Sequence, residues 1–239
     1  MDVSFIVTTF NKPEYLATVL RSIVNNVPDC AEIIIADAGS VCATRDLVCK
    51  FSASCEVPVR YCWLPDDGFR LSRSRNLAAL KATGRFLVVL DGDCVVTPGW
   101  WVRQEKFLKT NRIVFGSRLL LSAQQSAALV EDLSDGEMRL LAKGRKFLKI
   151  PLGIFRLLPK RSWRHFRGFY FSIERSKYLD LGGFDENYIG WGLEDSDFAV
   201  RALRLGMVLF DGRYAGSLLH LHHAVAAGVT PNKSKFDRC

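Results

Sequence analysis

Three groups of acidic and imidazole side chains are the main candidates for chemistry in this sequence. They are the pair Asp91 and Asp93, the acidic run Glu194, Asp195 and Asp197, and the histidines His220, His222 and His223. Carboxylate oxygen and imidazole nitrogen together suit manganese or a similar divalent ion. A carboxylate that is free of the metal can take a proton from a reacting hydroxyl. The sequence therefore holds the side chains for both a metal site and a general base.

Asp91 and Asp93 follow an uninterrupted apolar run. The run from Phe86 to Leu90 is typical of a strand that is covered on both faces. The two carboxylates then lie at the carboxyl end of a strand, where open α/β sheets bind ligands, and Gly92 lets the chain turn between them. We interpret the pair as holding a divalent metal and the ribose of a nucleotide, with Asp91 on the ribose hydroxyls. The alternative is an ordinary Asp-Gly turn.

Two earlier predicted strands also end in polar groups. Thr8 to Asn11 follow the first of them, and Asp37 to Ser40 follow the second. The carboxyl ends of parallel strands meet at one edge of a sheet, so these segments are candidates for a nucleotide crevice. Asp37 can accept a hydrogen bond from a base, although each residue taken alone can equally be a turn residue. Asn11 is also a candidate N-cap for a helix that begins near Pro13.

The elements that must position these residues alternate along the chain. Strands are predicted over residues 3–8, 32–36, 59–63 and 86–90, and helices over residues 13–23, 47–51, 71–82 and 194–205. Alternating strands and helices with short links favour an α/β fold with a mostly parallel sheet and helices on its faces. With 239 residues, of which 49% are hydrophobic, the chain can bury a core large enough for one domain.

Several motifs resemble family 2 glycosyltransferases with a GT-A fold. In the first half they are Val-Thr-Thr-Phe-Asn (7–11), Asp-Ala-Gly-Ser (37–40), Arg-Asn (75–76), Ala-Thr-Gly-Arg-Phe-Leu (82–87) and Asp-Gly-Asp (91–93). In the second half, Gly-Phe-Asp-Glu (183–186) and Gly-Trp-Gly-Leu-Glu-Asp-Ser-Asp-Phe (190–198) resemble the galactosyltransferase-like branch. The Gly-Trp-Gly-Leu-Glu-Asp motif is the most specific of these. The resemblance implies a GT-A fold and covers most of the chain outside residues 119–167.

The resemblance also implies roles for individual residues. The donor-binding set is Thr8, Phe10, Asn11, Asp37, Gly39, Ser40, Arg75, Asp91 and Gly92. The acceptor-binding set is Trp191, Gly192 and Glu194, and Asp195 takes the position of the catalytic base, with Glu194 beside it. From the residues alone, Trp191 can instead be a core anchor. Acidic residues at a helix start can also serve only the helix dipole.

Metal binding is expected from Asp93 and two of the C-terminal histidines. In a strand His220 and His222 would share a face, whereas in a turn His220 and His223 can converge. The resemblance favours Asp93, His220 and His223 as the ligands, with His222 as the alternate. We expect the metal to be manganese, with magnesium as the alternative.

Positive charge is plentiful and unevenly spread. The net charge is +8, which favours an anionic partner. Arg75 is expected to bind the diphosphate of the donor through two parallel hydrogen bonds. Residues 143–167 carry nine Lys or Arg and no acidic residue, interleaved with bulky apolar side chains. We interpret this stretch as a surface for anionic lipid, with a packed helical insertion or a grip on substrate phosphates as alternatives. No nucleic-acid motif accompanies the charge, so we expect no nucleic-acid partner.

The sequence also favours a cytoplasmic chain that can sit peripherally on the inner face of the cell membrane. No apolar run is long enough to cross a bilayer, and the first residues lack the basic start and cleavage site of a signal peptide. The seven cysteines form no Cys-x-x-Cys pair, and we expect them to be reduced and mostly buried.

These expectations combine into one hypothesis. The chain is expected to be one domain with a nucleotide-sugar-binding half (1–117), a basic insertion (118–167) and an acceptor-binding and metal-binding half (168–239). Its expected activity is metal-dependent transfer of a hexose or N-acetylhexosamine from a UDP-sugar to a hydroxyl of a cell-envelope glycan, which can be lipid-linked. Inversion at the sugar is implied by the resemblance. A metal-dependent nucleotidyltransferase of related architecture and a non-catalytic glycan-binding scaffold are the alternatives.

Overall fold

The computed structural model describes residues 2–28, 31–68, 70–132, 134–143, 162–213, 217–224 and 232–236. Within these residues the main sheet has seven strands in the order β3-β2-β1-β4-β8-β6-β9. The strands are β1 (Val3–Thr9), β2 (Ala31–Asp37), β3 (Val59–Trp63), β4 (Phe86–Asp91), β6 (Arg112–Phe115), β8 (Tyr170–Glu174) and β9 (Val208–Asp211). Strand β8 runs antiparallel to β4 and β6, and the other neighbours are parallel. The mostly parallel sheet that the sequence predicts is confirmed.

The register of the parallel strands brings the polar ends of β1, β2 and β4 to one edge. Thr8 of β1 lies opposite Ala36 of β2 and Asp91 of β4. Side chains alternate across a strand, so Phe5 contributes to the core on one face of the sheet and Ile6 to the core on the other. Burial on both faces explains why these strands are continuous apolar runs in the sequence.

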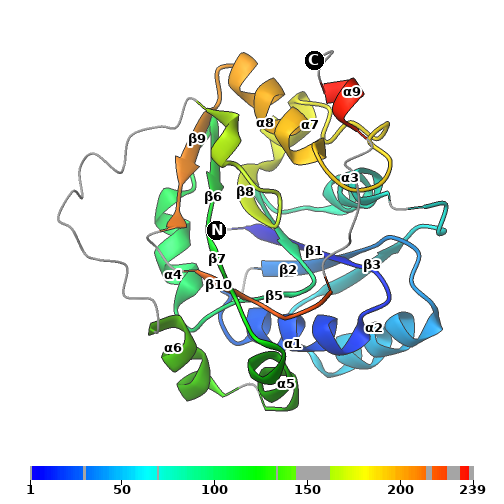
Figure 1. Ribbon diagram of the computed structural model, residues 1–239, viewed down its shortest axis with the longest axis vertical. Helices are drawn as coiled ribbons and strands as arrows, with labels where there is room; N and C mark the ends of the chain where they lie inside the picture. Colours follow the sequence, from blue (N-terminus) through cyan, green and yellow to red (C-terminus); the bar gives the residue numbers. More distant parts are fainter. Residues whose placement is uncertain are drawn as a thin grey trace.

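Helices cover both faces of the main sheet. Helices α1 (Pro13–Val24) and α2 (Cys42–Ser54) lie below it in Figure 1, whereas α3 (Leu71–Lys81), α7 (Arg175–Asp180) and α8 (Glu194–Arg204) lie above it. The other helical segments that the structure describes are α4 (Trp100–Gln104), η1 (Glu105–Phe107), α5 (Ala123–Glu131), α6 (Asp135–Lys143), η3 (Trp163–His165) and α9 (Lys233–Phe236). The buried apolar residues of α1 are Leu16, Val19, Leu20 and Ile23. Their helical spacing is why this segment folds as a helix against the sheet.

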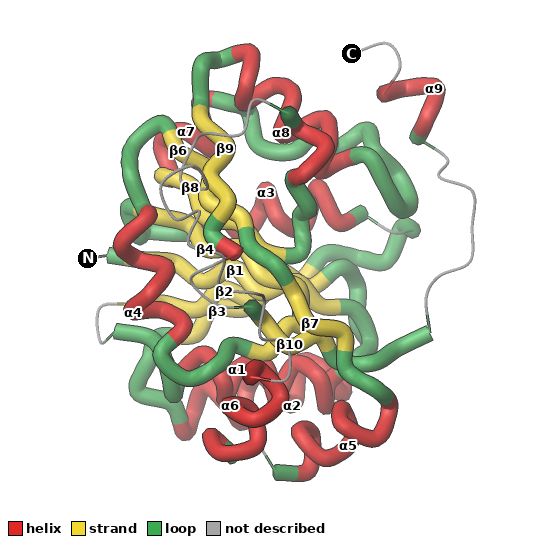
Figure 2. The backbone as a smooth tube through the Cα atoms, turned by 60° about the vertical axis from the view of Figure 1, so that its left-hand side comes forward, coloured by secondary structure: helices red, strands yellow, loops and turns green. Residues whose placement is uncertain are grey.

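A second sheet joins distant parts of the chain. It has the order β5-β10-β7 and consists of β5 (Cys94–Val95), β10 (Leu218–His220) and β7 (Arg118–Leu120). Strands β10 and β7 lie side by side below the main strands in the view of Figure 2. His220 lies opposite Cys94, the neighbour of Asp93, and the N–H of Leu221 donates to the carbonyl of Asp93 at 2.9 Å. Backbone pairing therefore holds the histidine segment against the turn after β4.

The cysteines differ from expectation. Cys62 and Cys94 are buried, but Cys42 and Cys49 on α2 are exposed, because this helix buries only Thr44 and Val48. The expectation that the thiols are mostly buried is therefore wrong for the described part of the chain.

The proposed membrane-binding stretch is mostly beyond the structural description. Residues 144–161 lie outside the described residues, and the role of this stretch stays a prediction. In the part of the chain that is described, no helix combines the length and hydropathy needed to cross a bilayer.

Candidate active site

Asp93, His220 and His223 converge where the two sheets meet. One potential ligand atom from each lies within 4.8 Å of the others. Asp93 Oδ1 is 3.4 Å from His220 Nε2, and Asp93 Oδ2 is 3.0 Å from His223 Nε2. His220 is buried, while Asp93 and His223 remain partly exposed. One carboxylate and two imidazoles that open toward solvent form a donor set that suits a divalent ion such as manganese.

The hydrogen-bond partner of His223 tests whether a cation fits this cluster. Nδ1 of His223 lies 2.9 Å from the carbonyl oxygen of Ala224. A carbonyl oxygen only accepts, so Nδ1 carries the hydrogen, and in the neutral ring, the form that binds a metal, Nε2 presents its lone pair to Asp93 Oδ2. Two acceptors 3.0 Å apart repel each other unless a cation lies between them. Backbone carbonyls commonly orient metal-binding histidines in this way. The residues therefore fit a divalent ion.

The surroundings of His220 keep its ring in the form that binds metals. Its pKa is lowered to about 4, mainly by burial, with Asp93 opposing the shift and Arg118 adding to it. The ring is thus neutral at neutral pH, as a metal ligand must be. The alternate ligand His222 lies outside the cluster. Its side chain is exposed, and its backbone N–H donates to Ser126 Oγ at 2.7 Å.

Asp91 is held by hydrogen bonds from two sides. Arg75 Nη2 donates to Asp91 Oδ1 at 2.9 Å, and Thr8 Oγ1 donates to the same oxygen at 3.1 Å. Burial raises the pKa of Asp91, and the guanidinium of Arg75 opposes that shift. Arg75 is only 1% exposed. The direct contact between Arg75 and the diphosphate stays a prediction. Nη2 of Arg75 is bound to Asp91, whereas its Nε and Nη1 are buried without a hydrogen-bond partner among the described residues.

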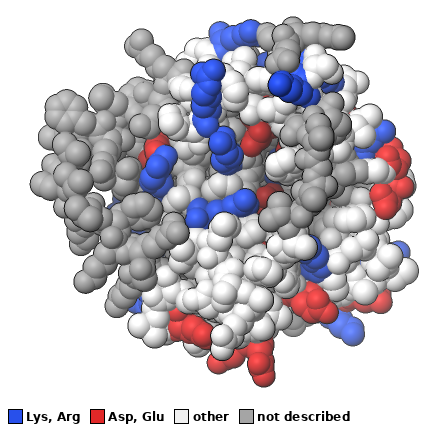
Figure 3. All heavy atoms as spheres, viewed as in Figure 1, with Lys and Arg blue, Asp and Glu red and all other residues white. Residues whose placement is uncertain are grey.

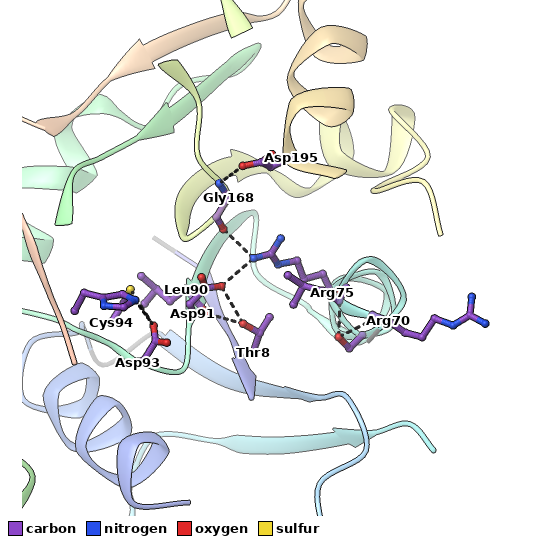
Figure 4. A network of polar contacts seen from close by, with 12 residues as sticks. Thr8, Arg70, Arg75, Leu90, Asp91, Asp93, Cys94, Gly168 and Asp195 are labelled. Atoms are coloured by element: carbon purple, nitrogen blue, oxygen red, sulfur yellow. Dashed lines mark hydrogen bonds and ion pairs between the residues drawn. The ribbon is translucent and has the colours of Figure 1, made fainter. Parts of the chain in front are cut away.

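One chain of polar contacts joins Asp91 to Asp195 (Figure 4). The carbonyl of Gly168 accepts from Arg75 Nη2 at 2.9 Å, and the N–H of Gly168 donates to Asp195 Oδ2 at 3.0 Å. A Cβ at position 168 would lie 3.1 Å from the Asp195 Cβ and 3.2 Å from Arg75 Nη1, so the close approach favours glycine. Arg75 and Gly168 therefore connect Asp91 in the first half of the chain to Asp195 in the second half.

Glu194 and Asp195 begin α8, whose position is fixed by an aromatic core. Phe198 stacks on Phe184 with ring centroids 4.5 Å apart, and both rings are buried. Burying one such side chain contributes about 1.5–3 kcal/mol. The pKa of Glu194 is raised, mainly by burial, with Arg75 opposing and Asp195 adding to the shift. Oε2 of Glu194 is buried and has no hydrogen-bond partner among the described residues. A buried, unpartnered carboxylate oxygen marks a place for a donor group of a ligand.

Residues 190–193, which the sequence predicts to bind the acceptor and which we call the acceptor loop, have an unusual backbone. Gly190, Gly192 and Leu193 have φ values of 80°, 102° and 71°. Glycine adopts such angles freely, whereas a residue such as leucine is strained there by about 1–3 kcal/mol. Trp191 is 58% exposed, so the core-anchor alternative is wrong and the ring is open to a ligand. Asn232, from the C-terminal segment, donates from Nδ2 to the Gly192 carbonyl at 2.9 Å.

The loop after β2 is organised by Asp37. Its Oδ1 accepts from the N–H groups of Gly39 and Ser40 at 3.1 and 2.7 Å, and its Oδ2 accepts from the hydroxyl of Tyr61 at 2.6 Å. Asp37 is 0% exposed. Its predicted hydrogen bond to a base stays a prediction that the burial disfavours, and its observed role is to shape the loop.

Asn11 joins this loop to the loop after β1. Its N–H donates to Ser40 Oγ at 2.8 Å, and its Oδ1 accepts from the N–H of Val41 at 2.9 Å. The expectation that Asn11 caps α1 is wrong, because its side chain is used in this bridge. Phe10 and Trp63 are exposed beside the bridge, and Trp63 Nε1 donates to the Ser40 carbonyl at 3.1 Å. Two open aromatic rings at this edge suit stacking against a base.

No motif in the sequence points to Arg118, which comes to the site through the pairing of β7 with β10. Its guanidinium stacks on the ring of Phe169 at 4.7 Å, and the Phe169 carbonyl accepts from the N–H of Asp91 at 3.0 Å. The side chain of Arg118 is exposed and, within the described structure, makes no ion pair or hydrogen bond. It lies close enough to lower the pKa of His220. Arg118 is therefore an available cation beside the carboxylates.

The surface around the site is rich in cations. Figure 3 shows Lys and Arg side chains around a hollow in the middle of the drawn face, with acidic atoms at its edge. Such a rim attracts a ligand that carries phosphate groups.

The sheet order and the helical layers are those of the GT-A fold. The structure aligns with S. aureus TarS residues 1–349 in complex with UDP-GlcNAc at a TM-score of 0.68 and 17% identity, covering 100% of this chain and 64% of that one. It aligns with GalNAc-T7, crystallised with UDP, GalNAc and Mn²⁺, at a TM-score of 0.67 and 18% identity, covering 97% of this chain and 45% of that one.

The family follows from the sequence comparison. The model of glycosyl transferase family 2 matches residues 4–127, and the chain belongs to this family. A model described as the N-terminal domain of galactosyltransferase matches residues 153–224. The hyaluronan synthase of Pasteurella multocida is 26% identical over 227 residues, which is 86% of this chain and 23% of that protein. The chain thus spans less than a quarter of that relative's length.

Proposed function

We propose that this family 2 glycosyltransferase is metal-dependent and inverting, and moves a hexose or N-acetylhexosamine from a UDP-sugar to a hydroxyl of a cell-envelope glycan. One observation carries the proposal. The Asp93, His220 and His223 cluster stands at the end of β4, and the Arg75–Gly168 bridge links that strand end to Asp195. A cation site and a candidate base are thereby fixed relative to each other.

The donor would bind along the carboxyl ends of β1, β2 and β4. Phe10 and Trp63 offer rings for the base, and Asp91 faces the ribose hydroxyls. A divalent ion held by Asp93 and the two histidines would neutralise the diphosphate as it leaves. Arg118 is placed to bind the same diphosphate, because its guanidinium is exposed and pre-oriented by Phe169. The fold neighbours crystallised with UDP-GlcNAc, or with UDP and Mn²⁺, support this choice of donor and ion.

The acceptor would bind on the acceptor loop and the start of α8. Trp191 offers a flat apolar ring to the C–H face of a sugar. Glu194 Oε2 is free to accept a hydrogen bond from an acceptor hydroxyl. Asp195 is oriented by the N–H of Gly168 and takes the proton of the attacking hydroxyl.

Transfer would then proceed by direct displacement. The acceptor oxygen attacks the anomeric carbon from the face opposite the diphosphate, and its proton passes to Asp195. The bond from the anomeric carbon to the diphosphate oxygen breaks in the same step, with inversion. UDP leaves with the bonding electron pair.

The setting of the reaction is also proposed. A relative named hyaluronan synthase supports a growing polysaccharide as the acceptor. We also propose a single domain and a cytoplasmic location, peripheral on the inner face of the membrane, as the sequence predicts.

The test is a panel of UDP-sugars and other nucleotide sugars, assayed for nucleotide release with Mn²⁺, with Mg²⁺ and with a chelator. We expect release of UDP from at least one UDP-sugar only when a divalent ion is present, and faster release when oligosaccharide acceptors are added. Release of pyrophosphate from a nucleoside triphosphate would favour the nucleotidyltransferase alternative. Absence of any nucleotide release would favour the scaffold.

A further inference from the structure

The C-terminal helix α9 lies against the acceptor loop, far from it in sequence. Asn232, the residue before α9, is 7% exposed and donates from Nδ2 to the Gly192 carbonyl at 2.9 Å. The carbonyl of Asn232 also accepts from the N–H of Phe236 at 3.1 Å, which closes the turn of α9. One buried residue therefore both begins α9 and binds the loop that carries Trp191.

Two further side chains of α9 attach it to the same half of the protein. Lys235 forms an ion pair with Asp185 at 3.1 Å and stands over the ring of Tyr188 at 4.6 Å. Phe236 packs edge-on against Trp163 with ring centroids 5.0 Å apart. The hydrogen bond from Asn232 is thus part of a docked segment with polar, ionic and aromatic contacts.

The acceptor loop contains a backbone conformation that needs support from its surroundings. Leu193 has a left-handed φ of 71°, and it stands at the N-cap of α8 without a side-chain capping bond. Glu194, the first residue of α8, follows directly. A strained residue persists only where its surroundings hold it. The side chain of Asn232 binds the carbonyl immediately before Leu193.

We propose that Asn232 is a positioning residue: it holds the acceptor loop in the conformation that presents Trp191 and Glu194 to the acceptor sugar. This inference rests on the proposed function, because it assigns a role within the same acceptor site. Asn232 acts through Gly192 and Leu193 and does not touch the reacting atoms. The carboxyl ends of β1, β2 and β4, which we call the donor edge, are held by the strands of the sheet and do not depend on Asn232.

The experiment compares the wild type with Asn232→Ala and with the matched control Ser234→Ala, whose side chain is exposed on the same helix. Hydrogen exchange of the amides in residues 190–194 and 8–11 is measured first, on the full chain without ligand. Loss of one buried hydrogen bond is worth about 1–3 kcal/mol, or roughly 5- to 150-fold in a local opening equilibrium. We expect Asn232→Ala to speed exchange in residues 190–194 by such a factor and to leave residues 8–11 unchanged.

Kinetics provide the second readout. With the glycan that the wild type glycosylates in the panel above, Asn232→Ala should raise the acceptor KM roughly tenfold, while the donor KM and the affinity for UDP with Mn²⁺ stay at wild-type values. Ser234→Ala should match the wild type throughout. Unchanged exchange in residues 190–194, or an equal loss of UDP affinity, would overturn the inference.

The two proposals fail in different ways. If the wild type releases UDP and transfers sugar but Asn232→Ala behaves identically, only the positioning role is wrong. If the wild type neither binds UDP nor uses any acceptor, both are wrong. If Asn232→Ala does not fold, Lys235→Ala weakens the same docking from a partly exposed position and is subjected to the same measurements; wild-type exchange in residues 190–194 of that variant would also contradict the proposal.

Discussion

The donor edge and the acceptor loop carry similar carboxylates on different supports. Asp91 ends β4, which is paired with β1 on one side and β8 on the other. Glu194 follows a loop with three left-handed residues, and a side chain from the C-terminal segment binds that loop. Backbone pairing thus fixes the donor edge, whereas the acceptor loop is bound by the side chain of Asn232 from a distant part of the sequence. We infer that the donor edge is the more rigid of the two regions and that the acceptor loop is the region whose conformation a single substitution can change.

The largest expected effect is on the donor side. Asp93→Ala removes the carboxylate that faces both histidines. A metal ion that neutralises a leaving diphosphate contributes several kcal/mol to the transition state, so we expect transfer to fall about a thousandfold or more. Steady-state rates over a Mn²⁺ titration measure it. His222→Ala, outside the cluster, is the control. Equal rates for Asp93→Ala and the control would contradict metal binding by Asp93.

The next effect belongs to the acceptor side. Asp195→Asn keeps the shape of the side chain but removes the base, and we expect kcat to fall about 10²- to 10⁴-fold. The affinity for UDP with Mn²⁺, measured by calorimetry, should stay the same because the donor edge is intact. Full transfer activity in this variant would remove Asp195 from the mechanism.

A smaller effect distinguishes binding of the diphosphate from binding of the uridine. Arg118→Ala should weaken UDP binding roughly tenfold or more, since hydrogen bonds to charged groups contribute about 1.5–3 kcal/mol, and should leave uridine binding unchanged. Arg112→Ala is the control variant. Arg112 also stacks on an aromatic ring, that of Phe210 at 4.5 Å, but it lies at the amino end of β6, whereas the donor is proposed to bind at carboxyl ends of strands. If UDP and uridine lose affinity equally, Arg118 does not bind the diphosphate.

The smallest effect concerns stability. The pKa of Glu194 is raised in the folded protein, mainly by burial, so folding favours its protonated form. Ionisation at neutral pH therefore lowers the free energy of unfolding, and this loss is absent below the ordinary pKa of a glutamate, about 4. Glu194→Gln should be more stable than the wild type at pH 8 and equally stable at pH 3.5, while transferring sugar more slowly. Urea unfolding at both pH values measures this, and a variant that is less stable at pH 8 would contradict it.

The contrast between the two regions also explains what the sequence could predict. The buried strands, their polar ends and the helix that begins at Glu194 follow from local periodicity, and the structure places them as expected. Spacing alone allowed either His222 or His223 to accompany His220, and the family resemblance favoured His223. Both His220 and His223 do lie beside Asp93. Their binding of a metal stays a prediction.

Features that depend on contacts across the chain were not predictable. Arg75 stands in a motif, but its burial against Asp91 and Gly168 is decided by tertiary packing. Arg118 reaches the site only because β7 pairs with β10. Asn232 has no motif around it, and its partner Gly192 lies in a different part of the chain. Local pattern carries no information on such partners.

The central claim is that Asp93, His220 and His223 hold a divalent ion that binds the nucleotide diphosphate. The most direct test is Mn²⁺ binding followed by electron paramagnetic resonance, with and without UDP, in the wild type, His223→Ala and His222→Ala. We predict that the wild type and His222→Ala bind Mn²⁺ more tightly when UDP is present, and that His223→Ala binds it at least tenfold more weakly. Equal Mn²⁺ affinity in all three proteins, or no effect of UDP, would contradict the claim.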